Sequence, residues 1–257
     1  MARENGNDWL TVAAIGLAAM CIVTFDHEAL GHGTACILLH GHIRLLTSSI
    51  FRCDVRSGWI DPAGPAANLL MGLLSLVCLR FVPRRLPGSR LLLILVTAFS
   101  WFWEAGYVIH AMHQRDGDLY FFAQFLLGDV TVWQRWLAAG AGVALYVLAG
   151  RITSASLLQL WPQPRAARAV ARAAWISATA GAALAALCYT GHGWGNFRDA
   201  VLEIGAASFP LLFLPRGSEP AAPMAGAASI LRNPIAISVS AAVYAIFVVA
   251  LGRGAVS

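Results

Sequence analysis

The chain has 257 residues, of which 58% are hydrophobic and only 12% are charged, and its mean hydropathy is +0.66. A soluble domain carries about 25% charged residues, so this composition excludes an ordinary soluble globular protein. The formal charge of +5 comes from 18 Arg with no Lys. These Arg residues cluster between apolar runs, which is typical of membrane topology rather than of nucleic-acid binding. We therefore expect an all-α, polytopic transmembrane protein whose partner is the lipid bilayer, with no nucleic-acid partner.

The first apolar run extends from Trp9 to about Leu39 and contains a polar island at Asp26–His32. A helix of about 31 residues would be about 46 Å long, which exceeds the roughly 30 Å hydrocarbon core of a bilayer. We therefore expect this helix to tilt, kink or break, and the island is where a break is predicted. The following stretch, Ile43–Asp61, is polar and β-branched without helical periodicity, which predicts a short loop or hairpin near the membrane surface.

The rest of the chain alternates between apolar runs and short polar links. The predicted helices cover, in order, Gly64 to about Val82, Leu91 to about His113, Trp133–Gly150, about Ala173–Tyr189, Phe197–Leu214 as a weaker candidate, and Pro234–Leu251. Leu119–Asp129 is a mixed segment, Gln163–Arg172 has the Arg spacing of an interfacial helix, and His192 is expected in a loop. The count is about six spans, give or take one, with no soluble domain.

Two of the links are rich in Arg. They carry Arg80, Arg84, Arg85 and Arg90 after the second predicted helix, and Arg151, Arg165, Arg168 and Arg172 after the fourth. The positive-inside rule places both links in the cytoplasm. The N-terminus is then cytoplasmic, and the links after the first and third helices lie outside. We expect a bacterial inner (plasma) membrane protein.

Ionisable groups at membrane depth are costly, and they indicate function. The island reads DHEALGH and holds Asp26, His27, Glu28 and His32 within seven residues. It resembles the zinc-binding pattern H-E-x-x-H, in which two His lie four residues apart and the Glu is a general base. Here the two His lie five residues apart, which is about 140° around a straight α-helix. A π-bulge, with i→i+5 bonding, would return both rings to one face, and Gly31 could assist this distortion.

A competing arrangement keeps a straight helix. Glu28 and His32 then form the pair on one face, about 40° apart, and His27 turns away. Both arrangements can recruit a carboxylate from the end of the third predicted helix, where Asp116 and Asp118 flank Gly117. We expect Asp118 to be this third ligand, with Asp116 as the alternative.

Two further stretches follow in order, GPAANLLMG at Gly64–Gly72 and DGD at Asp116–Asp118. Together with HEALGH they resemble the site-2 protease family of intramembrane zinc metalloproteases, over about residues 15–130. Shorter, uncharacterised relatives carry an H-E-x-x-G-H variant. The resemblance implies zinc bound by His27, His32 and Asp118, with Glu28 as the general base. It also implies that Gly64, Pro65 and Asn68 support the site or the substrate.

On this interpretation the protein is an intramembrane zinc metalloprotease that hydrolyses peptide bonds of membrane-associated protein or peptide substrates. Residues 1–130 would form the metalloprotease core, with HEALGH, GPAAN and DGD on three transmembrane helices. Residues 131–257 would add transmembrane helices of unknown role. The three motifs fall on one membrane face if each helix crosses once, so a common site is geometrically possible.

The sequence is also compatible with other functions and other ligands. A metal-binding membrane protein, or an inactive protease relative, remains the alternative function. An aspartyl intramembrane protease could use Asp26 and Asp118, but its G-x-G-D motif is absent because Arg115 occupies the first Gly position, and the serine-protease motif G-x-S-G is also missing. Structural or interfacial roles are expected for His40, His42, His110 and His113, and a polar or Arg partner is expected for Glu104. The five cysteines, Cys21, Cys36, Cys53, Cys78 and Cys188, are expected to be free thiols rather than disulfides.

Overall fold

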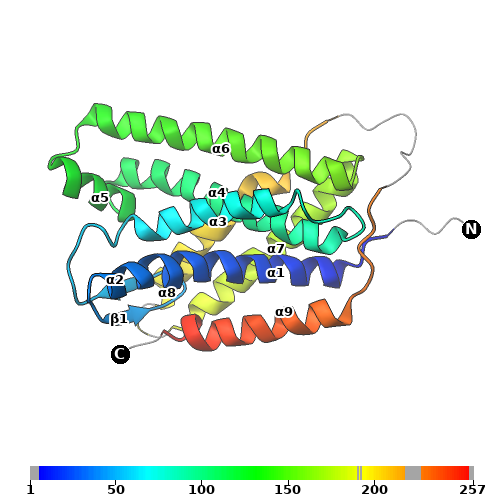
Figure 1. The fold of residues 1–257 in the computed structure, drawn as a ribbon, viewed down its shortest axis with the longest axis horizontal. Helices are drawn as coiled ribbons and strands as arrows, with labels where there is room; N and C mark the ends of the chain where they lie inside the picture. The colour runs from blue at the N-terminus through cyan, green and yellow to red at the C-terminus, as the bar shows by residue number, and fades with distance from the viewer. Residues whose placement is uncertain (1–5, 190, 192, 218–226, 255–257) are drawn as a thin grey trace, which may run out of the picture.

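The computed structural model describes residues 6–189, 191, 193–217 and 227–254. Within these residues, five helices are long and apolar enough to cross a membrane (Figure 1). The five helical segments cover Trp9–Leu38, Pro87–Gln114, Val132–Leu160, Pro164–Leu187 and Pro234–Gly252. The prediction of an all-α, polytopic transmembrane fold is therefore confirmed.

The first of these segments is built from three helical elements. They are α1 (Trp9–Phe25), the π-helix η1 (Asp26–Gly33) and α2 (Thr34–Leu38). A two-stranded antiparallel sheet follows, with β1 (Ile43–Leu46) paired to β2 (Phe51–Cys53). The predicted hairpin after the first helix is therefore present.

The remaining elements follow in chain order. They are α3 (Ala63–Cys78), α4 (Pro87–Gln114), α5 (Asp118–Leu127), α6 (Val132–Leu160), α7 (Pro164–Leu187), α8 (Gly193–Ala200), the π-helix η2 (Val201–Ala206), the 3-10 helix η3 (Phe209–Leu212), α9 (Pro234–Phe247) and the π-helix η4 (Val248–Gly252). At about 1.5 Å per residue, the 16 residues of α3 measure about 24 Å, so α3 is shorter than the roughly 30 Å hydrocarbon core.

Helices α1 and α4 form the centre of the bundle. Helix α1 packs against α4, α7 and α9, and α4 packs against α3 and α6. The face of α7 toward the bundle is a stripe of buried small side chains, Ala167, Ala171, Ala174, Ala178, Ala182 and Ala185. A methyl group added at Gly16 would lie 2.4 Å from the Ala174 carbonyl oxygen. The backbones of α1 and α7 therefore approach closely, as small residues allow in membrane helix pairs.

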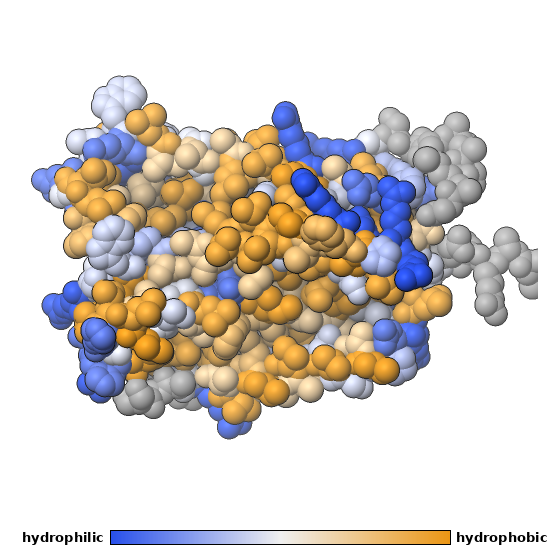
Figure 2. Space-filling view, in the orientation of Figure 1, coloured by the Kyte–Doolittle hydropathy of each residue, from blue (hydrophilic) through white to orange (hydrophobic). Residues whose placement is uncertain are grey.

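The outer helices expose apolar side chains. Buried residues make up 67% of the most apolar stretch of α4. They make up only 28% of that stretch in α6 and 22% in the segment formed by α9 and η4. Hydrophobic residues cover most of the middle of the visible face, and hydrophilic residues gather toward its two ends (Figure 2). Such an apolar belt requires lipid around it, because exposing this much apolar surface to water is unfavourable.

The two ends of the bundle carry different parts of the chain. The hairpin, α2 and α5 lie at one end, on the left of Figure 1, and the α3–α4 and α6–α7 links lie at the other end. The first predicted Arg-rich link is the α3–α4 link, which carries Arg80, Arg84 and Arg85. The α6–α7 link, residues 161–163, has no Arg, because Arg151 lies within α6 and Arg165, Arg168 and Arg172 lie within α7. The predicted link after the third helix, between α4 and α5, shares its end with the hairpin.

Several predicted helix boundaries differ from those in the structure. No separate interfacial helix covers Gln163–Arg172, because its residues from Pro164 onward belong to α7, whose Ala-rich sequence favours an unbroken helix. The fourth helix continues past Gly150 to Leu160. Instead of one span, Phe197–Leu214 is divided among α8, η2 and η3, and Pro210 cannot donate a helical hydrogen bond. His192 lies outside the described residues.

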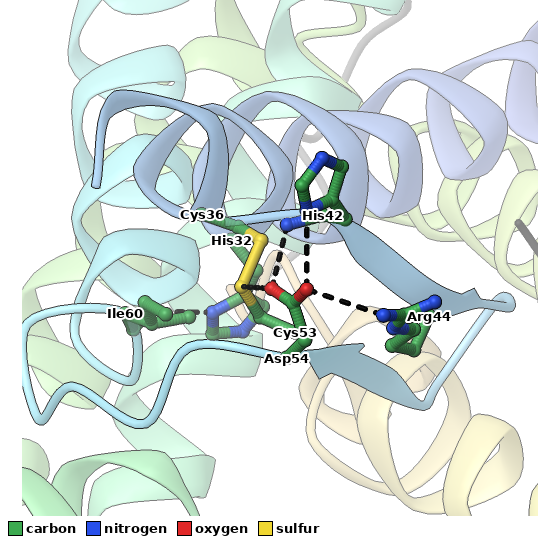
Figure 3. The surroundings of a disulfide bond; sticks show 7 residues. All are labelled: His32, Cys36, His42, Arg44, Cys53, Asp54 and Ile60. Atoms are coloured by element: carbon green, nitrogen blue, oxygen red, sulfur yellow. Dashed lines mark hydrogen bonds and ion pairs between the residues drawn. A yellow bond between two sulfur atoms is a disulfide. The ribbon is translucent and has the colours of Figure 1, made fainter. Parts of the chain in front are cut away.

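The prediction of free thiols is wrong for two of the five cysteines. Cys36, in α2, and Cys53, at the end of β2, form a disulfide (Figure 3) with their Cα atoms 6.0 Å apart. The chain turns back tightly between them, and a methyl group added at Gly41 would lie 2.5 Å from the Cys53 sulfur. Cys21, Cys78 and Cys188 are free. The disulfide therefore ties the hairpin to the end of the first long helix.

Candidate metal centre

The π-helix Asp26–Gly33 brings the two predicted His ligands to one face. The ring centroids of His27 and His32 lie 5.0 Å apart, and their Nε2 atoms are 3.3 Å apart. A straight α-helix would have separated these side chains by about 140°. The predicted π-distortion is confirmed. The competing straight helix, with His27 turned away, is wrong, since His27 is only 2% exposed.

The third member of the group is Asp118, the first residue of α5. Its Oδ2 lies 3.3 Å from His32 Nε2 and 3.7 Å from His27 Nε2. The preceding Gly117 has φ +90°, a conformation that glycine adopts readily, and the Asp118 N–H donates to Tyr107 Oη at 3.0 Å. Asp116 is exposed and accepts a hydrogen bond from the Gly117 N–H instead. The geometry therefore favours Asp118 over Asp116.

The outward-facing nitrogens of both imidazoles have partners. His32 Nδ1–H donates to the Ile60 carbonyl oxygen at 2.8 Å, and His27 Nδ1 lies 3.0 Å from Glu104 Oε1. Asn68 Nδ2 donates to the same Glu104 oxygen at 2.8 Å. A hydrogen bond at Nδ1 leaves the Nε2 lone pair free for a metal and orients the ring. Glu104 thus has the polar partners expected for it, and Asn68 supports the site through Glu104.

The start of α3 lies directly against the imidazoles. A methyl group added at Gly64 would lie 2.4 Å from His32 Nε2 and 2.7 Å from His27 Nε2. One added at Gly31 would lie 2.5 Å from the Gly64 Cα. Pro65 is buried in the first turn of α3, where its missing N–H costs nothing. The GPAAN stretch therefore supports the site through a glycine contact and through Asn68.

Aromatic rings hold both imidazoles in place. The Trp103 ring stacks on His27, with centroids 4.5 Å apart and an interplanar angle of 11°. The Phe51 ring of β2 stacks on His32 at 5.5 Å and 22°. Neither contact can be predicted from the sequence, because each joins elements that are distant along the chain. Glu104, in contrast, could be identified from the sequence, because it is a charged residue inside an otherwise apolar helix.

The three ligand atoms fit a zinc ion by chemistry and spacing. They lie within 4.8 Å of one another, and two imidazole nitrogens with one carboxylate oxygen are donors that Zn²⁺ accepts. Burial alone would raise the pKa of Asp118, but the two imidazoles beside it lower the pKa well below its usual range. The carboxylate is therefore in the ionised form that a metal requires.

A cavity of about 850 Å³ opens over this group. Glu28 lines it, is 4% exposed, and has an Oε2 atom without a hydrogen-bond partner among the described residues. Glu203, in η2, also lines this cavity. We predicted no role for the C-terminal half of the chain, and nothing near Glu203 in the sequence indicates that its side chain reaches this cavity.

The other candidate ligands do not join the group. Within the described part of the chain, His27, His32 and Asp118 are the one set of three potential ligands close enough to share an ion. His42 pairs with Asp54 at 3.1 Å, and His40, His110 and His113 are exposed. Asp26 is buried but stands outside the group, with Oδ2 unpartnered.

No protein-family model, curated protein or solved structure matches the chain. The resemblance to the site-2 protease family therefore stays a prediction that rests on the three motifs.

Proposed function

We propose that the chain is an intramembrane zinc metalloprotease. The observation that carries this proposal is the π-helix, which turns His27 and His32 toward Asp118 despite their five-residue spacing. A regular helix is the ordinary outcome for an apolar sequence, and π-bulges are frequent at functional sites. The same turn carries Glu28, the predicted general base, on the wall of the cavity.

His27 and His32 would hold the ion through Nε2, and Asp118 through its carboxylate. Zinc bound there would polarise a peptide carbonyl and lower the pKa of a water molecule toward neutrality. Three protein ligands with an open position are typical of catalytic rather than structural zinc sites. The cavity provides space for that open position.

Glu28, which lines the cavity, would move the proton in the reaction. Its Oε2 accepts no hydrogen bond from the described residues, so it could accept a proton from a water molecule in the cavity. The same oxygen can then donate this proton to the departing amine nitrogen, as a general base that becomes a general acid. Glu104 and the Ile60 carbonyl meanwhile hold the two imidazoles through Nδ1.

The size of the cavity suits a peptide segment. About 850 Å³ lies in the range of ligand-binding clefts, roughly 300–1,000 Å³. The cavity lies between the hairpin region and α5, at one end of the bundle. A membrane-associated substrate could therefore present a short extended stretch to the site at the membrane surface.

The test compares two carboxylates of the π-helix in the purified, membrane-reconstituted protein. Glu28→Gln should retain bound zinc and lose peptide cleavage by about 10²- to 10⁴-fold, the usual contribution of a general base. Asp26→Asn removes the neighbouring buried carboxylate and should retain both zinc and cleavage. Zinc binding without any cleavage by the unaltered protein would support a metal-binding membrane protein or an inactive relative instead. Loss of zinc in Glu28→Gln would make Glu28 a ligand.

A further inference from the structure

One wall of the cavity carries two arginines that the catalytic proposal does not use. Arg52 lies in β2 and Arg56 lies in the segment that follows, and both line the cavity and are exposed. Neither forms an ion pair or a side-chain hydrogen bond within the part of the chain that the structure describes. Their charges are therefore available to a molecule that enters the cavity.

The acidic residue between them is already engaged. Asp54 Oδ1 accepts a hydrogen bond from the His42 N–H at 2.7 Å, and Oδ2 lies 3.1 Å from His42 Nδ1 and 3.4 Å from Arg44 Nη2 (Figure 3). The hydrogen bond from the His42 backbone lowers the pKa of Asp54. Asp54 therefore pairs with Arg44 and His42 rather than with the cavity arginines.

The remaining charged groups of the cavity come from other elements. The carboxylates are Glu28 of η1, Asp61 before α3, Asp118 of α5 and Glu203 of η2. Asp118 lies against the two imidazoles. The two arginines lie in β2 and in the segment after it, and Asp61 lies later in that same segment. The other three carboxylates lie on helical elements, so an entering chain would meet Arg52 and Arg56 on the hairpin side of the cavity.

The arginine wall is held close to the proposed metal. Phe51, next to Arg52, stacks on the His32 ring, and the disulfide anchors Cys53, on the other side of Arg52, to α2. An extended peptide advances about 3.3–3.6 Å per residue. A substrate side chain that contacts Arg52 or Arg56 would therefore lie in the same cavity as the bond at the metal, a short stretch of chain away from it. Phe121 and Phe125 of α5 also line the cavity and offer apolar contact.

We propose that this wall is a specificity site for acidic side chains. The preferred substrate is a membrane-associated segment with Asp or Glu near the scissile bond, flanked by apolar residues that contact α5. This inference rests on the proposed protease function. Arg side chains at a membrane surface also attract anionic lipid headgroups, so the experiment must separate a peptide carboxylate from a lipid phosphate.

The experiment measures binding and cleavage of matched peptides in phosphatidylcholine bicelles, with and without added phosphatidylglycerol. The peptides differ only by Glu, Gln or Lys near the cleavage position, and binding is measured by fluorescence anisotropy on Glu28→Gln, which should not cleave them. The Glu peptide should bind about fivefold more tightly, the scale of an exposed ion pair. Arg52→Gln with Arg56→Gln should abolish this preference, and Arg52→Glu with Arg56→Glu should reverse it toward Lys peptides.

Arg44→Gln is the matched control, because it removes one charge from the same hairpin without altering the cavity lining. It should leave the preference intact. Equal binding of the Glu and Gln peptides in phosphatidylcholine would overturn the inference. An equal loss of preference in Arg44→Gln would overturn it too, because the field of the whole hairpin would then be responsible. The inference would also be overturned if the Arg52 and Arg56 substitutions changed the effect of phosphatidylglycerol on binding but not the preference between the Glu and Gln peptides.

The two proposals can fail separately. If the Glu peptide binds with the predicted preference but the unaltered protein does not cleave it, the acidic specificity site stands and the protease function fails. If the unaltered protein cleaves both peptides equally well and binds them equally, the protease function stands and the specificity site fails.

Discussion

At the residue scale, Gly64 and Gly31 determine how closely α3 approaches the imidazoles. The hypothetical methyl groups at these positions meet ring nitrogens or backbone at 2.4–2.5 Å, and such contacts cannot be relieved by rotating a flexible side chain. Trp103 and Phe51 then hold the rings from other sides. The metal group is therefore fixed by its packing as well as by its ligands.

Gly64→Ala should weaken zinc binding at least tenfold, because the new methyl group would occupy the space next to both Nε2 atoms. Zinc affinity is measured by competition with a chromophoric chelator. Gly140→Ala is the matched control, since a methyl group there meets nothing within 4 Å. It should retain zinc and stabilise α6 by up to about 1 kcal/mol. Unchanged zinc affinity in Gly64→Ala would show that the ligands lie elsewhere.

Glu104→Gln should lower zinc affinity about 10- to 100-fold, the usual effect of losing a hydrogen-bond partner behind a metal-binding histidine. The reason is that Glu104 Oε1 holds both His27 Nδ1 and Asn68 Nδ2. Asp116→Asn changes an exposed carboxylate two residues before Asp118 and should leave the affinity unchanged. If Asp116→Asn has the larger effect in the same titration, the assignment of Asp118 as third ligand is wrong.

At the element scale, the five-residue spacing of His27 and His32 made the π-helix predictable. Helical geometry allowed only two ways to use these residues, and one of them required i→i+5 bonding. The disulfide was not predictable in the same way. Cys36 and Cys53 are 17 residues apart, and only the hairpin register brings them together. Contacts between distant elements, such as Trp103 with His27, could not be predicted for the same reason.

Reduction of the Cys36–Cys53 disulfide should destabilise the hairpin end of the protein. Closing a loop of about this length contributes about 3 kcal/mol in the chain-entropy account. Cys36→Ser, Cys53→Ser and the double variant should therefore lower the thermal unfolding temperature by the same amount in a mild detergent. Cys188→Ser, at a free and exposed thiol, should not change it. If alkylation of the unreduced, denatured protein labels five thiols instead of three, the disulfide is absent.

At the scale of the whole molecule, composition and hydropathy predicted about six spans and an apolar belt, and five helices are long and apolar enough to cross a membrane within the described residues. The predicted helix from Gly64 to about Val82 corresponds to the shorter helix α3. The division of Phe197–Leu214 among α8, η2 and η3 was only partly predictable, because Pro210 signals a break but nothing in the sequence signals the π-helix η2. The candidate site was predictable as far as its motifs extend. Glu203 could not be found, since only the packed bundle brings η2 to the cavity.

We expect the end with the candidate site to face outward, away from the cytoplasm. Disulfides persist in oxidising compartments, and the positive-inside rule places the opposite, Arg-rich end in the cytoplasm. Reporter fusions after Arg85 and after Pro162, in the α3–α4 and α6–α7 links, should therefore read cytoplasmic. A fusion after Asp116 should read external. The opposite pattern would place the disulfide in a reducing compartment and reject this orientation.

The central claim is that His27, His32 and Asp118 bind one zinc ion. Anomalous diffraction at the zinc absorption edge, from crystals of the zinc-loaded protein, tests it most directly. We predict one strong anomalous peak within about 2.0–2.2 Å of both Nε2 atoms and an Asp118 carboxylate oxygen. The peak should persist in Glu28→Gln and vanish in His32→Ala. A peak elsewhere, or none between these three residues at saturating zinc, would contradict the claim.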